Sequence, residues 1–146
     1  MFNDYWMIEK GLITRPSHGD LRDLITYRHD EGATVSVSPD DTLSVVHARM
    51  RLYDISQLPV LDNDRVVGVI DEWDLLNSLK NDTQHFSLTA REAMSDQVKT
   101  LPKEASPDDL LAIFDRGFVA VILDGDRFLG LITRTDVLNH WRQTLR

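Results

Sequence analysis

The chain has 146 residues, of which 42% are apolar and 27% are charged, and its net charge is −8. This length allows one compact domain or two small fused halves with a buried core. The acidic balance argues against a nucleic-acid partner, because affinity for phosphate backbones comes mostly from lysine and arginine. No apolar run approaches the roughly 20 residues that cross a membrane, and the N-terminus lacks a secretory-signal pattern. We therefore expect a cytoplasmic protein with no membrane partner.

Cysteine and histidine usage narrows the chemistry further. The chain has no cysteine, which excludes disulfides, thiolate catalysis and thiolate metal sites. The histidines are His18, His29, His47, His85 and His140, and no two of them are four residues apart. The sequence therefore predicts no metal site.

Residues 1–31 are predicted to form an N-terminal helical linker segment. DYWMIEKG (4–11) suits a brief helix, and RPSHG (15–19) is expected to interrupt it. DLRDLITYRHD (20–30) has the spacing of an amphipathic helix, carried by Leu21, Leu24, Ile25 and Arg28. We interpret this segment as a connection to something else.

The rest of the chain contains one unit twice, as repeat 1 (32–80) and repeat 2 (94–146), joined by a loop and a short helix (81–93). Three stretches align: GVIDEWDLL (68–76) over GLITRTDVL (130–138), LPVLDND (58–64) over AVILDGD (120–126), and DDTLSVVHARM (40–50) over EASPDDLLAIF (104–114). A duplication of this length predicts two half-domains that bury their apolar faces against each other.

Each repeat is expected to run strand, helix, strand, strand, helix. The first strands are VSV (35–37) and VKTL (98–101), and the helices after them begin at the N-caps Thr42 and Ser106. Nearly continuous apolar runs joined by Asp-Asn-Asp or Asp-Gly-Asp predict hairpins. Gly117 suits the end of a helix, and TARE (89–92) has the spacing of a capping box. The predicted fold class is α+β (mixed α/β), with two β-α-β-β-α repeats related by pseudo-two-fold symmetry.

A strand, a helix and a hairpin ending in glycine, two aliphatic residues, Thr or Ser, two variable residues and Asp resembles the CBS domain, which occurs in tandem pairs. The resemblance covers roughly residues 33–142. GLITRTD (130–136) matches the ligand-site pattern of the family, whereas GVIDEWD (68–74) departs from it at Asp71. The resemblance to the CBS domain implies a non-catalytic regulatory module with no cofactor of its own.

The flanking sequence narrows the resemblance. FNDYWMIEKG (2–11) and RLYDISQLPVLD (51–62) look like the C-terminal regulatory part of bacterial cystathionine β-synthases. The catalytic half of those enzymes, which binds pyridoxal phosphate, is absent here. The resemblance thus implies a module that modulates a pyridoxal-phosphate enzyme and forms a homodimer through its helices.

The resemblance also implies an adenosyl ligand (S-adenosylmethionine, AMP, ADP or ATP) in a cleft between the repeats. Carried over by position, the ligand-binding residues would be Ala33, Val35, Ile55, Ser56, Ile132, Thr133, Arg134 and Asp136. A second, weaker site would use Asp71, Asp74, Gln97, Lys99 and Phe118. Asp71 places a carboxylate close to where a phosphate would lie, so the second site is expected to reject phosphates.

Each of these residues also has a simpler interpretation. Thr133 and Asp136 have the spacing of a capping box, which fixes a helix start without any ligand. Asp136 can instead accept two hydrogen bonds from a ribose diol, and the two roles are compatible. Arg134 either pairs with a phosphate or is an exposed helical arginine. Val35 and Ile132 can be plain core residues.

Three other functions compete with the ligand-sensing module. One is hydrolysis by paired carboxylates, either Asp71 with Asp74 or Asp62 with Asp64. Another is a structural dimerisation module without ligand, supported by the apolar helix residues Leu75, Leu76, Leu79 and Trp141. The third is a CBS pair that regulates a different enzyme or a transporter.

Overall fold

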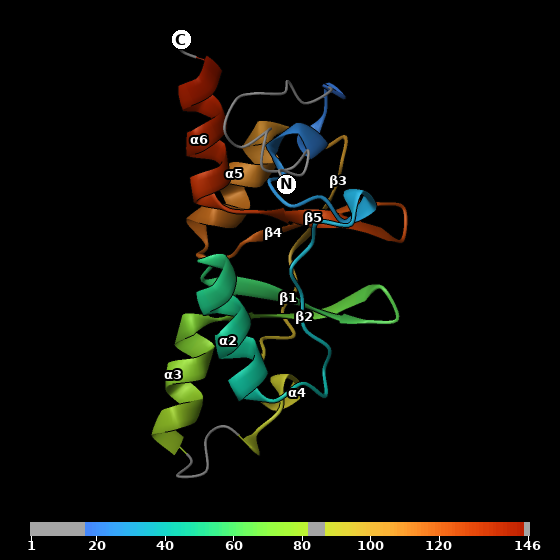
Figure 1. The fold of residues 1–146 in the computed structure, drawn as a ribbon. Coiled ribbons are helices and arrows are strands. Elements are labelled where there is room, and N and C mark those ends of the chain that lie inside the picture. Colours follow the sequence, from blue (N-terminus) through green and yellow to red (C-terminus); the bar gives the residue numbers. More distant parts are fainter. Residues whose placement is uncertain (1–16, 82–86, 145–146) are drawn as a thin grey trace, which may run out of the picture.

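In the computed structural model, which describes residues 17–81 and 87–144, two similar halves are stacked on each other (Figure 1). The first half contains α2 (Leu43–Tyr53), β1 (Gln57–Asp62), β2 (Arg65–Asp71) and α3 (Glu72–Asn81). The second contains β3 (Thr100–Pro102), α5 (Pro107–Asp115), β4 (Ala120–Asp124), β5 (Arg127–Ile132) and α6 (Arg134–Thr144). Helix α4 (Ala90–Ala93) lies between them in sequence. The predicted mixed α/β fold of two repeats is confirmed.

Each half is built around an antiparallel hairpin with the same register. Strands β1 and β2 are joined by Asn63 and Asp64, whose φ angles of 51° and 65° are those that a type I′ turn needs. Strands β4 and β5 are joined by Gly125 and Asp126. Both hairpins have a register shift at equivalent positions, Val60/Leu61 and Ile122/Leu123. The repeated Asp-x-Asp sequences therefore make the same hairpin twice, as predicted.

The third strand differs between the halves because of one proline. In the second half, β3 pairs in parallel with β4, and the Val121 amide donates to the Lys99 carbonyl at 2.8 Å. The position of Val121 is taken in the first half by Pro59, which has no amide hydrogen to donate. The ladder there is reduced to a single bridge between Val37 and Val60. The predicted strand over 35–37 is therefore wrong in extent.

The helix ends follow the predicted capping chemistry. The Thr42 hydroxyl accepts from the Val45 amide at the start of α2. Ser106 with Asp109 and Thr89 with Glu92 form capping boxes at the starts of α5 and α4. Gly117 follows α5 with a φ of 84°, the left-handed conformation that favours glycine after a helix.

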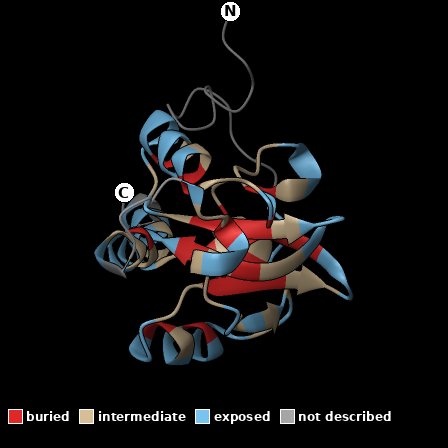
Figure 2. Ribbon diagram, turned by 90° about the horizontal axis from the view of Figure 1, so that it is seen from below, coloured by how far each residue is buried: buried red, intermediate tan, exposed pale blue. Residues whose placement is uncertain are grey.

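Buried apolar residues form two clusters, one in each half, on the strands and on the inner sides of the helices (Figure 2). The first contains Val37, Leu43, Val46, Met50, Leu58, Val60, Ile70, Leu75 and Ala90. The second contains Leu21, Ile25, Leu110, Phe114, Ala120, Ile122, Leu129 and Ile132. Two residues of the N-terminal segment thus belong to the core of the second half.

The single amphipathic helix predicted over 20–30 is wrong. The structure has two short 3-10 helices there, η1 (Leu21–Leu24) and η2 (His29–Glu31), and the chain bends between them at Thr26 and Tyr27. Ile25 packs directly over Gly130, where a Cβ atom would collide with its side chain. Arg28 is buried, and its Nε donates to the Arg22 carbonyl at 2.9 Å. These tertiary contacts outweigh the helical spacing. The predicted helix over 4–11 lies outside the described residues.

The first half has a counterpart of this contact. Beyond α4, the side chain of Met94 and the carbonyl of Ser95 lie against Gly68, and Ser95 forms an antiparallel bridge with Val69. In both repeats, then, the glycine of the last strand lets a segment from outside its own repeat pack closely on the sheet. For repeat 2, that segment is the N-terminal one.

Candidate functional site

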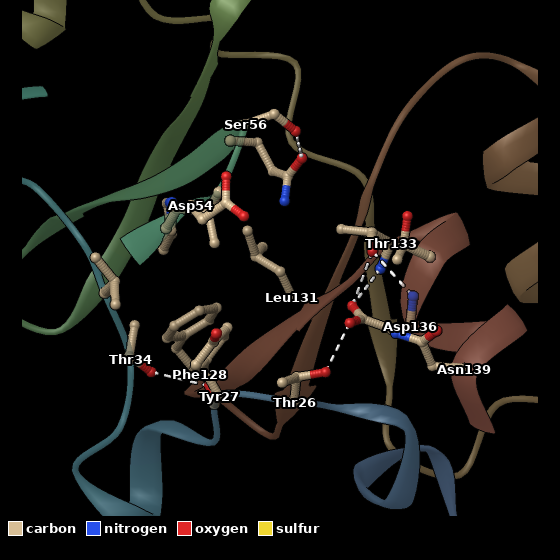
Figure 3. Close-up of a pocket in the computed structure, with 15 residues that line it drawn as sticks. Thr26, Tyr27, Thr34, Asp54, Ser56, Phe128, Leu131, Thr133, Asp136 and Asn139 are labelled. Carbon is tan, nitrogen blue, oxygen red and sulfur yellow. Dashed lines mark hydrogen bonds between the residues drawn. The ribbon is translucent and has the colours of Figure 1, made fainter. Parts of the chain in front are cut away.

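Two clefts of similar size lie between the repeats. Cleft 1 has a volume of about 370 Å³ and cleft 2 of about 380 Å³. Cleft 1 is lined by Thr26, Tyr27, Thr34, Val35, Asp54, Ile55, Ser56, Gln57, Pro59, Phe128, Leu131, Thr133, Thr135, Asp136 and Asn139 (Figure 3). Cleft 2 is lined by Ser56, Gln57, Val69, Asp71, Glu72, Trp73, Asp74, Ser95, Gln97, Lys99, Gly117, Phe118 and Val119. Ser56 and Gln57 form a wall that the clefts share.

The structure brings most of the predicted site residues to these clefts. Val35, Ile55, Ser56, Thr133 and Asp136 line cleft 1. Asp71, Asp74, Gln97, Lys99 and Phe118 all line cleft 2. Ala33, Ile132 and Arg134 line neither.

Ile132 and Arg134 are held elsewhere. Ile132 is completely buried in the core of the second half, and its neighbour Leu131 lines cleft 1 instead. Successive residues of a strand point to opposite faces, so the cleft receives the residue before the predicted one. The guanidinium of Arg134 donates to the Phe114 carbonyl at 2.6 Å. This geometry gives no support to pairing of Arg134 with a phosphate.

Thr133 and Asp136 form the predicted capping box at the start of α6. Asp136 Oδ2 accepts from the Thr133 amide at 2.8 Å and from the Thr133 hydroxyl at 3.0 Å. In return, the Asp136 amide donates to Thr133 Oγ1 at 3.2 Å. The predicted capping box is therefore present in the structure. Because Thr133 and Asp136 also line cleft 1, the box fixes the Asp136 carboxylate at the edge of that cleft.

Thr26 is a site residue that the sequence analysis missed. Its hydroxyl donates to Asp136 Oδ1 at 2.7 Å, from the N-terminal segment to a residue 110 positions later (Figure 3). Asp136 is thus held by both of its oxygens. A carboxylate has about four lone-pair sites, so Asp136 can still accept from a ligand hydroxyl. Thr26 lies outside the duplicated part, and no sequence pattern marked it.

Pro59 makes the backbone beside cleft 1 differ from the backbone beside cleft 2. Because Pro59 has no amide hydrogen, the carbonyl of Val35 receives no ladder hydrogen bond from it. At the equivalent position of repeat 2, the Lys99 carbonyl accepts from the Val121 amide. The two clefts are therefore unequal in their backbone as well as in Asp71 and Thr133.

Cleft 2 has three carboxylates at its helix mouth, those of Asp71, Glu72 and Asp74. The Asp71 amide donates to Asp74 Oδ2 at 2.9 Å, and the Asp74 amide donates to Asp71 Oδ1 at 2.8 Å. Burial, together with the nearby charge of Asp71, raises the pKa of Asp74 to about 6. Across the cleft, the Lys99 ammonium lies 4.9 Å from the centre of the Phe118 ring.

We predict that Asp71→Thr lowers the pKa of Asp74 from about 6 towards the ordinary carboxyl value, because it removes the neighbouring negative charge. In the wild type, the folded state takes up a proton on Asp74 at a pH where the unfolded chain does not. Stability therefore falls as the pH rises from about 4 to about 6, and the variant should flatten this dependence. Carbon-13 NMR titration of the Asp74 carboxyl measures the shift. An unchanged pKa would show that burial alone raises it.

Other kinds of site find no support in the described residues. Within 17–81 and 87–144, no cluster of three or more histidine, aspartate or glutamate side chains could hold a metal. No helix in these ranges is long and apolar enough to span a bilayer. Of the proposed hydrolytic pair Asp62 and Asp64, Asp62 ends β1 and Asp64 lies in the exposed turn that follows, where its Oδ1 is 3.4 Å from His29 Nε2. Neither residue lines cleft 1 or cleft 2.

The fold and its clefts define a tandem-repeat module in which two related α/β units enclose two unequal clefts. The family described as CBS domain matches residues 32–81 and again residues 90–142. The chain belongs to this family and contains a tandem pair of CBS domains.

Two relatives with similar sequences are larger proteins. The chain is 31% identical over 106 residues to an uncharacterized protein of Methanocaldococcus jannaschii, a match that covers 70% of this chain and 34% of that protein. It is 30% identical over 108 residues to the inosine-5′-monophosphate dehydrogenase of the same organism, covering 71% of this chain and 21% of the enzyme. The chain thus spans about a third and a fifth of the length of these relatives.

A solved structure with the same fold is that of CBSX2 in complex with AMP. Its TM-score is 0.73, with 18% sequence identity, and the match covers 87% of this chain and 98% of that one. At this identity the likeness shows the fold. These comparisons give no support to the narrower resemblance to cystathionine β-synthase.

Proposed function

We propose that the chain is a non-catalytic regulatory module that binds an adenosyl ligand in cleft 1 and modulates an enzyme in the cytoplasm. The observation that carries this proposal is the position of Asp136. Its carboxylate is fixed at the edge of an open inter-repeat cleft by the Thr133 box and by Thr26. A fixed carboxylate beside a cleft suits a ribose diol, because one ribose hydroxyl can donate to the acceptor site that Thr133 and Thr26 leave free.

The rest of cleft 1 suits an adenine base. The Val35 carbonyl, which Pro59 leaves without a ladder donor, can accept from the exocyclic amine of adenine. Ile55, Leu131 and Phe128 supply apolar and aromatic surface for the ring. AMP and S-adenosylmethionine share this adenosyl part, and the AMP complex of a protein with the same fold supports the class of ligand.

The partner is an enzyme domain, in the same chain or in another. The relation to inosine-5′-monophosphate dehydrogenase favours an enzyme of nucleotide metabolism. This relation favours such an enzyme over the pyridoxal-phosphate enzyme, a cystathionine β-synthase, that the flanking sequence predicted. A transporter is the other alternative for a CBS pair.

The helices present an apolar face that suits a homodimer. Its exposed residues are Leu52 and Tyr53 on α2, Trp73 and Leu76 on α3, Leu111 on α5, and Leu138 and Trp141 on α6. These helices lie at the end of the sheets opposite the hairpin turns (Figure 1). Apolar side chains gathered on one face are typical of a protein interface.

Calorimetric titration with S-adenosylmethionine, AMP, ADP and ATP in parallel tests the function. We expect at least one compound to bind, to raise the melting temperature and to be recovered unchanged. Hydrolysis of the bound compound would favour the paired-carboxylate enzyme. If none binds at millimolar concentration while sedimentation shows a stable dimer, the chain is a structural dimerisation module.

A further inference from the structure

The charges of cleft 1 indicate which adenosyl compounds it takes. Its described lining residues include the carboxylates of Asp54 and Asp136 and no lysine, arginine or histidine side chain. We propose that cleft 1 selects adenosyl compounds whose 5′ substituent carries no phosphate, with Asp54 as the specificity-determining residue. The inference rests on the proposed function and deepens it.

Asp54 is placed by the end of helix α2. Its backbone has a φ of 53° and a ψ of 50°, and its amide donates to the carbonyls of Arg51 and Met50. Its side chain lies across cleft 1 from Asp136 (Figure 3). Among the described residues, no lysine, arginine or histidine side chain lines cleft 1 beside Asp54, whereas Arg51 and His47 line a neighbouring pocket with it.

A phosphate would meet like charge on both sides of this cleft. A phosphate monoester carries a charge between about −1.5 and −2 at neutral pH, and carboxylates a few ångströms away repel it. At the start of α6, Asp136 Oδ2 already accepts from the Thr133 amide, so that amide is not available to a phosphate. A helix N-terminus favours an anion, and here the protein supplies that anion itself.

An uncharged or cationic 5′ substituent avoids this repulsion. A hydroxyl, a thioether or an amine placed near Asp54 can donate to the carboxylate or lie beside it without charge repulsion. A positive charge would be attracted by both carboxylates. Cleft 2 differs in charge, because its described wall includes a cation, Lys99, as well as the carboxylates of Asp71, Glu72 and Asp74.

Because the backbone of Asp54 is left-handed, its charge can be removed by a residue that also adopts this conformation. Asparagine tolerates this conformation nearly as well as aspartate does, so Asp54→Asn removes the charge and keeps the end of α2. The matched control is Asp40→Asn, which removes the same charge from a side chain that is 88% exposed and lines neither cleft.

The experiment titrates the full chain with adenosine, AMP and 5′-amino-5′-deoxyadenosine at neutral pH and low salt. We expect the wild type to bind the amine most tightly and to bind AMP at least about tenfold more weakly than adenosine, since two carboxylates repel the phosphate. Asp54→Asn should reduce the ratio of the AMP Kd to the adenosine Kd by about fivefold, which corresponds to the removal of one nearby charge. Asp40→Asn should leave that ratio unchanged.

Two results would overturn the selection while leaving adenosyl binding intact. One is equal affinity of the wild type for AMP and adenosine, and the other is an unchanged ratio in Asp54→Asn. Absence of binding by all three compounds would overturn the proposed function and this inference with it.

Discussion

Replacing Asp136 with alanine should weaken adenosyl binding in cleft 1 by about tenfold or more. A ribose hydroxyl would lose its hydrogen bond to a charged acceptor, worth about 1.5–3 kcal/mol, and 1.4 kcal/mol corresponds to a tenfold change in affinity. The same substitution also removes the box at the start of α6, which should cost about 1 kcal/mol of stability. Calorimetric titration measures the first effect and urea unfolding measures the second.

The chain contains a matched control for the structural part of this effect. Asp109 caps α5 in the same way, accepting from the Ser106 amide at 3.1 Å, but it lines neither cleft. Asp109→Ala should therefore cost a similar amount of stability and leave adenosyl affinity unchanged. If both variants lose affinity equally, the Asp136 effect is one of helix capping, and the carboxylate does not touch the ligand.

Thr26→Val provides a more conservative test of the same carboxylate. It removes the hydroxyl that donates to Asp136 Oδ1 while it keeps the capping box and the charge. If Thr26 only positions Asp136, the affinity should fall far less than in Asp136→Ala, and Thr26→Ser should restore it.

The sequence predicted what depends on local chemistry and on the duplication. The Asp-x-Asp turns, the caps at Thr42 and Ser106, and the last strand of each repeat all follow from short-range rules, and the structure has them. The residues predicted for cleft 2 all line it, because the alignment of the repeats carried them over position by position. For cleft 2, the repeated sequence pattern and its register were enough to predict these lining residues.

The errors arise where distant parts of the chain meet. Leu21 and Ile25 had helical spacing, but their burial depends on packing against the sheet of repeat 2, which local periodicity does not describe. Thr26 reaches Asp136 only because of that packing. Ile132 was placed one residue away from the cleft-lining Leu131, since register at the end of a strand depends on the bulge in the hairpin.

Asp54 had a signal in the sequence that the alignment made easy to overlook. It ends α2 at the position where Gly117 follows α5, and both adopt the left-handed conformation. A change from glycine to aspartate at such a position adds backbone strain and one negative charge. The offset between the aligned stretches changes by two residues just before the first hairpin strand. Asp54 and Gly117 lie at this change, so the aligned stretches do not pair them.

Ile25→Ala should lower the free energy of unfolding by about 2–5 kcal/mol, which is a large part of the stability of a domain of this size. Ile25 is completely buried, belongs to the core cluster of the second half and packs over Gly130. The substitution leaves a cavity against a glycine that has no side chain to fill it. Urea unfolding of the full chain measures the loss. The control is His18→Ala, an exposed residue of the same segment, which should change stability by less than about 0.5 kcal/mol. A loss below about 1 kcal/mol for Ile25→Ala would show that the N-terminal segment rests on repeat 2 without contributing to its core.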